Sequence, residues 1–106
     1  MKTFKLKDYI KGWIIGNFEP SIIKTDVFEI GIKTYTSGDY EKSHFHKIAT
    51  ELTIICTGLV KMNNIEYVSG DIILIEPGDI TDFACLKDSV TLVVKLPSVT
   101  DDKYLI

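Results

Sequence analysis

Short hydrophobic runs, separated by polar turn residues about every 8–12 positions, extend along the whole chain. In the clearest run, Phe28, Ile30 and Ile32 alternate with Glu29 and Lys33, which is the period of two expected of a half-buried strand. Glycine, proline, asparagine and aspartate bound the runs, and no stretch has helical periodicity. The pattern therefore predicts an all-β fold, a sandwich or a barrel of antiparallel strands.

The other runs fit strands of the same kind. We expect them at 12–16, 43–47, 51–57, 59–62, 65–68, 72–75, 80–86 and 90–96, with a short edge strand and a turn within 1–11. The run 72–75 is apolar throughout, which predicts a fully buried strand. Asn63-Asn64 suits a tight hairpin loop because asparagine tolerates positive φ. A further turn is expected at Lys87-Asp88.

Length and charge limit the classes of function. A chain of 106 residues is expected to form one domain with one core. The net charge of −3 gives no reason to expect nucleic acid or an anionic membrane as partner. Met1 to Asp8 carries scattered charges with no apolar block after it, so we expect no signal peptide, no membrane span and a cytoplasmic location. Cys56 and Cys85 lie in apolar runs, which predicts buried thiols.

The chain has no arginine, so lysine is the only basic side chain besides histidine. A phosphorylated ligand would therefore have to be held by lysine, hydroxyl groups or backbone amides. Trp13 suits either stacking on a sugar or, as the favoured alternative, packing in the core or in an interface. Asp101-Asp102 is expected in a solvated tail. Strands with apolar residues on both faces predict a homodimer contact. The outward-facing residues expected in this contact include Leu52, Ile54, Cys56 and Val93.

His44 and His46 are the only two histidines and stand two positions apart. On a strand, this spacing directs both imidazoles to the same face. A short polar turn from Lys47 to Thr50 then reverses the chain, and Glu51 opens the next run, on a strand expected to lie beside the first. Two imidazoles and a carboxylate that meet in this way form either a small metal site or an acid–base site.

The same residues carry a resemblance to a known family. Gly38, His44, His46, Glu51 and Gly58 match the first motif of the cupin superfamily: a glycine, five residues, His-x-His, three or four residues, a glutamate, six residues and a glycine. The match covers five fixed positions within 21 residues, which makes it specific.

The second cupin motif is present with two departures. Gly70-Asp71 and Pro77-Gly78 stand in place, and the Asn-Asn hairpin between the motifs is similar to that of cupins. Glu76 replaces the usual proline, and Thr81 replaces the usual histidine. Threonine is a poor ligand for a transition metal compared with imidazole. Asp79 shares the parity of Thr81 and is the one candidate to replace it, whereas the neighbouring Asp82 has the opposite parity.

The resemblance implies that residues 1–106 form a single double-stranded β-helix barrel, the jelly roll of cupins. It also implies a homodimer, formed by sheet packing or by exchange of an edge strand, for which residues 1–16 are the candidate. In metal-binding cupins, the positions of His44, His46 and Glu51 hold one divalent transition metal, and iron, manganese, zinc and nickel all fit this ligand set. The predicted pocket walls are Thr53, Ile55, Thr81 and Phe83.

Three functions follow from these residues. The first is a mononuclear metal site that acts on a small polar metabolite or sugar, with His46 and Glu51 as candidate catalytic residues, in an enzyme of the dioxygenase or isomerase type. The second is a metal-free sugar isomerase or epimerase that uses the histidine pair for proton transfer, which the replacement at Thr81 favours. The third is a barrel that binds a small ligand without catalysis.

Overall fold

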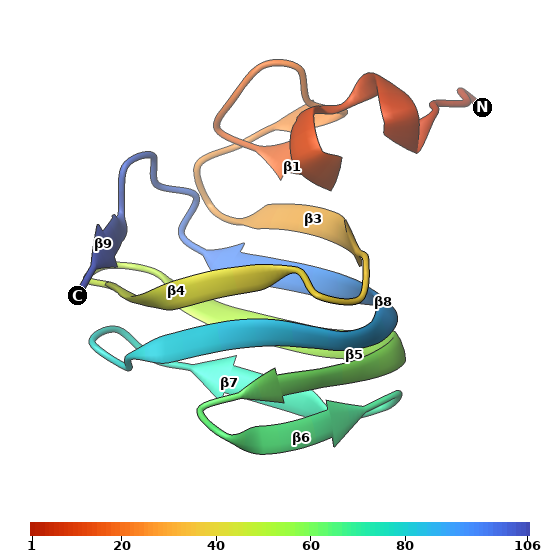
Figure 1. The fold of residues 1–106 in the computed structure, drawn as a ribbon. Coiled ribbons are helices and arrows are strands. Elements are labelled where there is room, and N and C mark those ends of the chain that lie inside the picture. The colour runs from red at the N-terminus through yellow and green to blue at the C-terminus, as the bar shows by residue number, and fades with distance from the viewer.

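A computed structural model describes all of residues 1–106 (Figure 1). Nine strands form a single curled sheet, which confirms the predicted all-β fold. Every strand pair is antiparallel except β1 with β2. The strands are β1 (Trp13–Gly16), β2 (Ile23–Lys24), β3 (Glu29–Tyr35), β4 (Tyr40–His46), β5 (Thr50–Met62), β6 (Ile65–Val68), β7 (Ile72–Ile75), β8 (Thr81–Leu96) and β9 (Lys103–Leu105).

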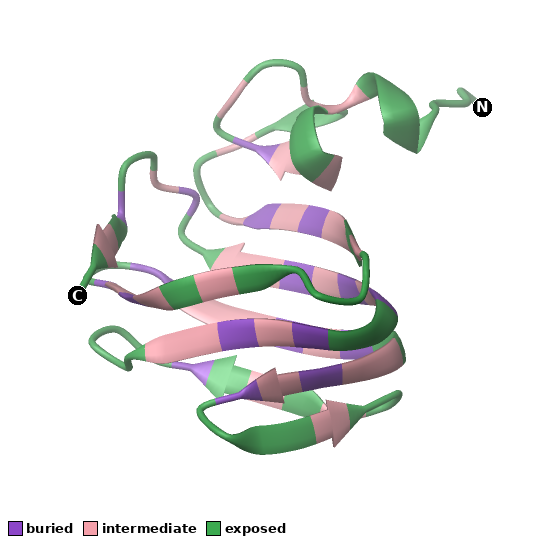
Figure 2. Cartoon of the chain, viewed as in Figure 1, coloured by how far each residue is buried: buried purple, intermediate pink, exposed green.

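The long bent strand β8 is the centre of the fold. Its first half pairs with β4 and its second half with β3, while β5 pairs with it along most of its length. Figure 1 shows β1 and β3 at one end of the molecule and β6 and β7 at the other. Buried and less buried residues alternate along these strands (Figure 2), as a sheet with one covered face requires. The core consists of Ile55, Val60, Met62, Ile75, Phe83 and Cys85.

The turn predicted at Lys87-Asp88 is wrong, because β8 runs through these residues without a break. Ser89 explains the difference. Its hydroxyl accepts the backbone N–H of Leu59 (3.1 Å) and donates to the carbonyl of Lys87 (2.6 Å). Gly58, with φ 97°, lies so close to Ser89 that a Cβ would clash. The polar residues therefore mark a place where β5 and β8 bend together.

Two other local predictions have different outcomes. The hairpin at Asn63-Asn64 is confirmed, since Met62 pairs with Ile65 and both asparagines have positive φ, 50° and 65°. The edge strand expected within 1–11 is wrong. That segment forms two short 3-10 turns, η1 (Leu6–Asp8) and η2 (Ile10–Gly12). No helix in the structure has the length and apolar character needed to cross a membrane.

The outer face of the sheet is apolar. In-register pairs place eight aliphatic side chains in two rows across β7, β5, β8 and β3. We call these the two aliphatic rows, Leu74–Leu52–Val94–Ile30 and Ile72–Ile54–Leu92–Ile32. The prediction of a fully buried strand at 72–75 is wrong, because Ile72 and Leu74 are 64% and 56% exposed. Cys56 is exposed, so the buried thiol predicted there is wrong, whereas the one predicted at Cys85 is confirmed. The outward position predicted for Val93 is also wrong, because Val93 is buried and lines the cavity.

Candidate functional site

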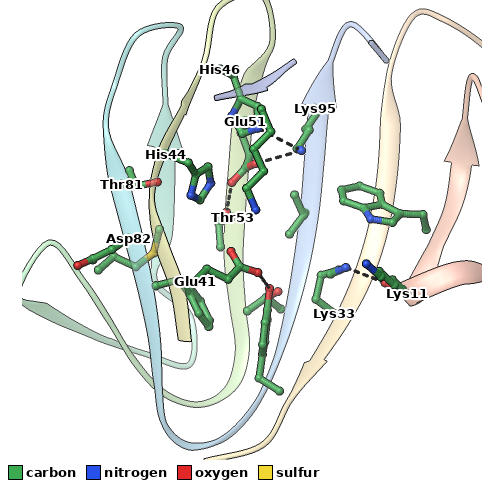
Figure 3. Close-up of a pocket in the computed structure, with 17 residues that line it drawn as sticks. Lys11, Lys33, Glu41, His44, His46, Glu51, Thr53, Thr81, Asp82 and Lys95 are labelled. Carbon is green, nitrogen blue, oxygen red and sulfur yellow. Dashed lines mark hydrogen bonds and ion pairs between the residues drawn. The ribbon is translucent and has the colours of Figure 1, made fainter. Parts of the chain in front are cut away.

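A cavity of about 280 Å³ opens inside the curled sheet (Figure 3). Its walls come from β1, β3, β4, β5, β8 and β9 and from the 3-10 turn η2. Of the residues singled out in the sequence, the cavity is lined by His44, His46, Glu51, Thr53, Thr81 and Phe83. Ile55 is fully buried in the core and does not line it.

Strand β4 supplies both histidines and an additional carboxylate. The pairing of β4 with β8 shifts register between Glu41 and His44, so a bulge brings an odd and an even position into the same cavity. His44 Nδ1 lies 2.8 Å from the carbonyl of Lys42, and the centroids of the His44 and His46 rings are 5.6 Å apart. Because a carbonyl oxygen only accepts, Nδ1 of His44 carries a proton and Nε2 is the nitrogen free to contact a ligand. Sequence alternation alone could not place Glu41 here.

The turn between His46 and Glu51 is organised by the C-terminal segment. The Asp102 carboxylate accepts the backbone N–H groups of Lys47, Ile48 and Ala49 at 2.9–3.2 Å. Asp102 is only 5% exposed, so its placement in a solvated tail is wrong. Burial would raise the pKa of Asp102, but these three backbone hydrogen bonds outweigh it and lower the pKa. Strand β9, just after Asp102, pairs with β4 and covers the histidine strand.

The strands that carry His46 and Glu51 do not pair with each other, contrary to the expectation of adjacent strands. β4 pairs with β8 and β9, and β5 with β6, β7 and β8. The two side chains meet across the cavity because the sheet curls. Figure 3 shows Glu51 directed toward His46 and Lys95. Thr53 Oγ1 donates to Glu51 Oε2 at 2.8 Å, which fixes the orientation of the carboxylate.

Lys95 is the residue that the sequence did not point to. Its ammonium nitrogen lies 3.5 Å from His46 Nε2 and 3.8 Å from Glu51 Oε1, between the two groups. Burial lowers the pKa of His46, and the positive charge of Lys95 lowers it further, so the imidazole is neutral near pH 7. The one available signal was a lysine at an inward-facing position of the apolar run 90–96.

The donor set does not fit a resident metal ion in this arrangement. No three histidine, cysteine or carboxylate side chains converge on one point. Thr81 lines the cavity where cupins usually have a histidine, and Asp79 is exposed and accepts the backbone N–H of Glu76 (2.9 Å). A lysine ammonium next to His46 and Glu51 would also repel a cation there.

The opposite side of the cavity is formed by β1, η2 and β3. Figure 3 shows Lys33 and Lys11 on this side, away from His44 and Thr81. Trp13 also lines the cavity and is only partly buried, so its placement in the core is wrong. Near the floor, Tyr35 donates to Glu41 Oε1 (3.3 Å). Burial and the negative charge of Glu41 raise the pKa of Tyr35, which keeps the phenol protonated.

Comparison with known proteins identifies the fold. No family model matches the sequence, and no curated protein does. Solved structures do match. One is an uncharacterized conserved protein with a double-stranded β-helix domain from Klebsiella pneumoniae, with a TM-score of 0.71, 17% identity and coverage of 98% of this chain and 90% of that chain. Another is KdgF from a Halomonas species (TM-score 0.66, 16% identity, 73% and 74% covered).

A third similar structure is a sugar phosphate isomerase of the cupin superfamily from Silicibacter pomeroyi. Its TM-score is 0.59 at 20% identity, and the match covers 66% of this chain and 50% of that chain. Together with the nine-stranded curled sheet, these likenesses define the class. The chain has the double-stranded β-helix fold of cupins, as the two sequence motifs implied. These similarities establish the fold alone, so the chemistry must be inferred from the residues of the site.

Proposed function

We propose that the cavity binds a small polar molecule, such as a sugar, and that His46 and Glu51 transfer a proton on it without a metal ion. The single observation that carries this proposal is the position of Lys95, whose ammonium lies between His46 and Glu51. Cupin-fold proteins related by structure include a sugar phosphate isomerase, which supports the same class of chemistry. The cytoplasmic location predicted from the sequence is part of this proposal.

The proposed step is proton abstraction next to a carbonyl group. A neutral His46 accepts the proton at Nε2 and returns it to the neighbouring carbon, so atoms and charge balance over the cycle. Lys95 carries the positive charge that stabilises the oxyanion formed on the carbonyl oxygen. Glu51, held by Thr53, keeps the ammonium in place and moves the hydroxyl proton of the substrate to the former carbonyl oxygen, which completes the isomerisation.

A divalent metal ion on His44, His46 and Glu51 is the second candidate. One observation favours it: His44 Nδ1 is held by a backbone carbonyl at 2.8 Å, an arrangement that is usual for metal-binding histidines. A bound ion would act as a Lewis acid on a carbonyl oxygen. This candidate requires Lys95 to leave its present position.

Lys95→Met separates the two candidates. We expect wild-type protein, purified without chelators, to contain far less than one metal ion per chain and to melt at the same temperature with and without EDTA. Lys95→Met removes the competing charge, and we expect it to gain Zn²⁺ binding in a calorimetric titration, at least tenfold tighter than wild type. Lys61→Met, which removes a charge outside the cavity, is the matched control. One stoichiometric ion in wild type would instead support the metal candidate.

Proton transfer is tested by exchange. In D₂O, NMR would follow the loss of the α-proton of small keto- and aldo-sugars. We expect exchange with wild type and at least a hundredfold slower exchange with His46→Asn, because the asparagine cannot accept the proton. A sugar that binds without exchange would indicate the third function, a non-catalytic binding barrel, and would contradict the proposed step.

We also propose that the chain forms a homodimer through the two aliphatic rows. A monomer would leave Ile72 and Leu74 largely exposed on a face of eight aliphatic side chains, which soluble monomers rarely do. A stable dimer buries about 800 Å² on each partner, an area that a four-stranded sheet face can supply. Exchange of residues 1–16 between subunits is the alternative route.

Leu74→Glu is expected to convert the dimer to a monomer in light scattering after size exclusion, because it places a charge within the proposed contact. Ile65→Glu is the matched control, since Ile65 is equally exposed (56%) but lies outside the rows. In the wild-type dimer, Cys56 should react slowly with a thiol reagent, and in Leu74→Glu it should react rapidly. A wild-type monomer at all concentrations would refute both routes, and a dimer of Leu74→Glu would favour strand exchange.

A further inference from the structure

The cavity gathers positive charge in an acidic protein. Four lysines and three acidic residues line it, a net charge of +1, whereas the whole chain carries −3. The three carboxylates, Glu41, Glu51 and Asp82, already accept hydrogen bonds from Tyr35, Thr53 and the backbone of Asn63. Of the four ammonium groups, only that of Lys95 has a carboxylate within 4.0 Å. The excess charge therefore lies on lysine.

Two of these ammonium groups lie near the Trp13 ring. The nitrogens of Lys33 and Lys95 each lie 5.1 Å from the centroid of its ring, within the range of a cation–π contact. The ring rests directly on Gly31, where an added Cβ would come within 2.7 Å of it. Gly31 pairs with Val93 of β8, so the indole lies on the inner face of the sheet, beside both lysines.

A buried hydroxyl without a partner lies at the same place. Thr91 pairs directly with Lys33 across β3 and β8, lines the cavity and is 1% exposed. Its Oγ1 makes no hydrogen bond in the structure. A buried hydroxyl left unpaired destabilises a protein, and burial lowers the pKa of Lys33. A negatively charged acceptor would give the Thr91 hydroxyl a hydrogen-bond partner and would favour the charged form of Lys33.

We propose that Lys33, Lys95 and Thr91 form an anion-binding subsite, so that the ligand of this cavity carries a carboxylate or a phosphate group. The two ammonium groups supply charge and the hydroxyl supplies a directed donor, which suits a compact anion with several oxygens. Lys33 also donates to the carbonyl of Lys11 at 2.8 Å, which fixes its side chain without using its charge. The cavity volume of about 280 Å³ is at the small end of the range for ligand pockets, so the ligand must be a small metabolite.

This inference rests on the proposed function, since it names the ligand class of the same cavity and shares Lys95 with it, but its test does not require proton transfer. The anion itself is the probe. Sodium acetate, inorganic phosphate and the neutral isostere acetamide would be titrated into ¹⁵N-labelled protein at constant ionic strength. The reporters are the Trp13 indole N–H and the backbone N–H groups of Gly31 and Thr91.

Acetate or phosphate is expected to give saturable shifts with a dissociation constant of about 1–10 mM, and acetamide none. The tighter of the two anions identifies the group as carboxylate or phosphate. Lys33→Met should weaken binding about tenfold, the loss expected for one charged hydrogen bond, whereas Lys61→Met should not change it. Thr91→Val should weaken anion binding and raise the unfolding temperature, because it removes the unpaired hydroxyl.

Weaker anion binding together with a higher unfolding temperature in Thr91→Val would distinguish a binding role of Thr91 from a structural one. The proposal is refuted if neither anion saturates, if acetamide binds equally well, or if Lys33→Met binds as wild type does. His46→Asn should retain anion binding. Anion binding together with absent proton exchange would leave the subsite intact and refute only the catalytic proposal, and the reverse result would refute the subsite alone.

Discussion

Asp102→Asn is expected to lower the free energy of unfolding by about 2–3 kcal/mol, measured by urea denaturation. The Asp102 carboxylate accepts the N–H groups of Lys47, Ile48 and Ala49 with both oxygens. Asparagine keeps one oxygen, and its amide N–H group faces a backbone donor. At least one buried N–H therefore loses its partner, and the remaining hydrogen bonds lose the assistance of charge.

The adjacent Asp101 offers a matched control. It is exposed and has a positive φ of 58°, a conformation that asparagine adopts readily, so Asp101→Asn should change stability by less than about 0.5 kcal/mol. Equal effects of the two substitutions would contradict the assigned role of Asp102.

The same carboxylate predicts a pH dependence. Since the pKa of Asp102 is lower in the folded protein, its contribution to stability is full above the unfolded pKa of about 4 and is lost as the pH falls through the folded pKa. Asp102→Asn should remove this part of the acid sensitivity. The turn that separates His46 from Glu51 should loosen as well, visible as faster hydrogen exchange at Ile48 and Ala49.

The imidazole of His46 is expected to titrate below the usual pKa of about 6.5, and Lys95→Met is expected to raise that pKa. Burial is the largest cause of the lowering and remains in the variant, whereas the repulsion from the Lys95 ammonium at 3.5 Å is removed. The attraction of Glu51 then acts without competition. The measurement is an NMR titration of the His46 Cε1–H signal between about pH 5 and pH 8.

Lys47→Met is the control for this titration, because Lys47 is next to His46 in sequence but its ammonium lies over the Tyr104 ring, 4.3 Å from the centroid. It should leave the pKa of His46 almost unchanged. In wild type, the unfolded chain takes up the histidine proton first as the pH falls, so stability decreases from about pH 6.5 down to the folded pKa. A lower pKa in Lys95→Met would show that Lys95 does not act on His46 as the structure places it.

Local sequence patterns predicted some residues of the site but not others. The His-x-His spacing and Glu51 were recognisable because strand alternation and motif spacing are local properties of the chain. Lys95 and Asp102 were not, since each contacts the histidine strand across about fifty positions of sequence. The bulge in β4 turns Glu41 into the cavity. It interrupts the strict alternation of side chains from which the sequence predicts which residues face inward.

The sequence by itself determined the all-β fold, the Asn63-Asn64 hairpin and the common face of His44 and His46, because these follow from period, turn chemistry and side-chain type. Only the tertiary structure decided that Lys95 stands between His46 and Glu51, that Trp13 lies beside Lys33 and Lys95, and that Ile72 and Leu74 face outward. The physical reason is that curling one sheet around β8 sets the distances between residues remote in sequence. Those distances determine charge, desolvation and hydrogen bonding within the cavity.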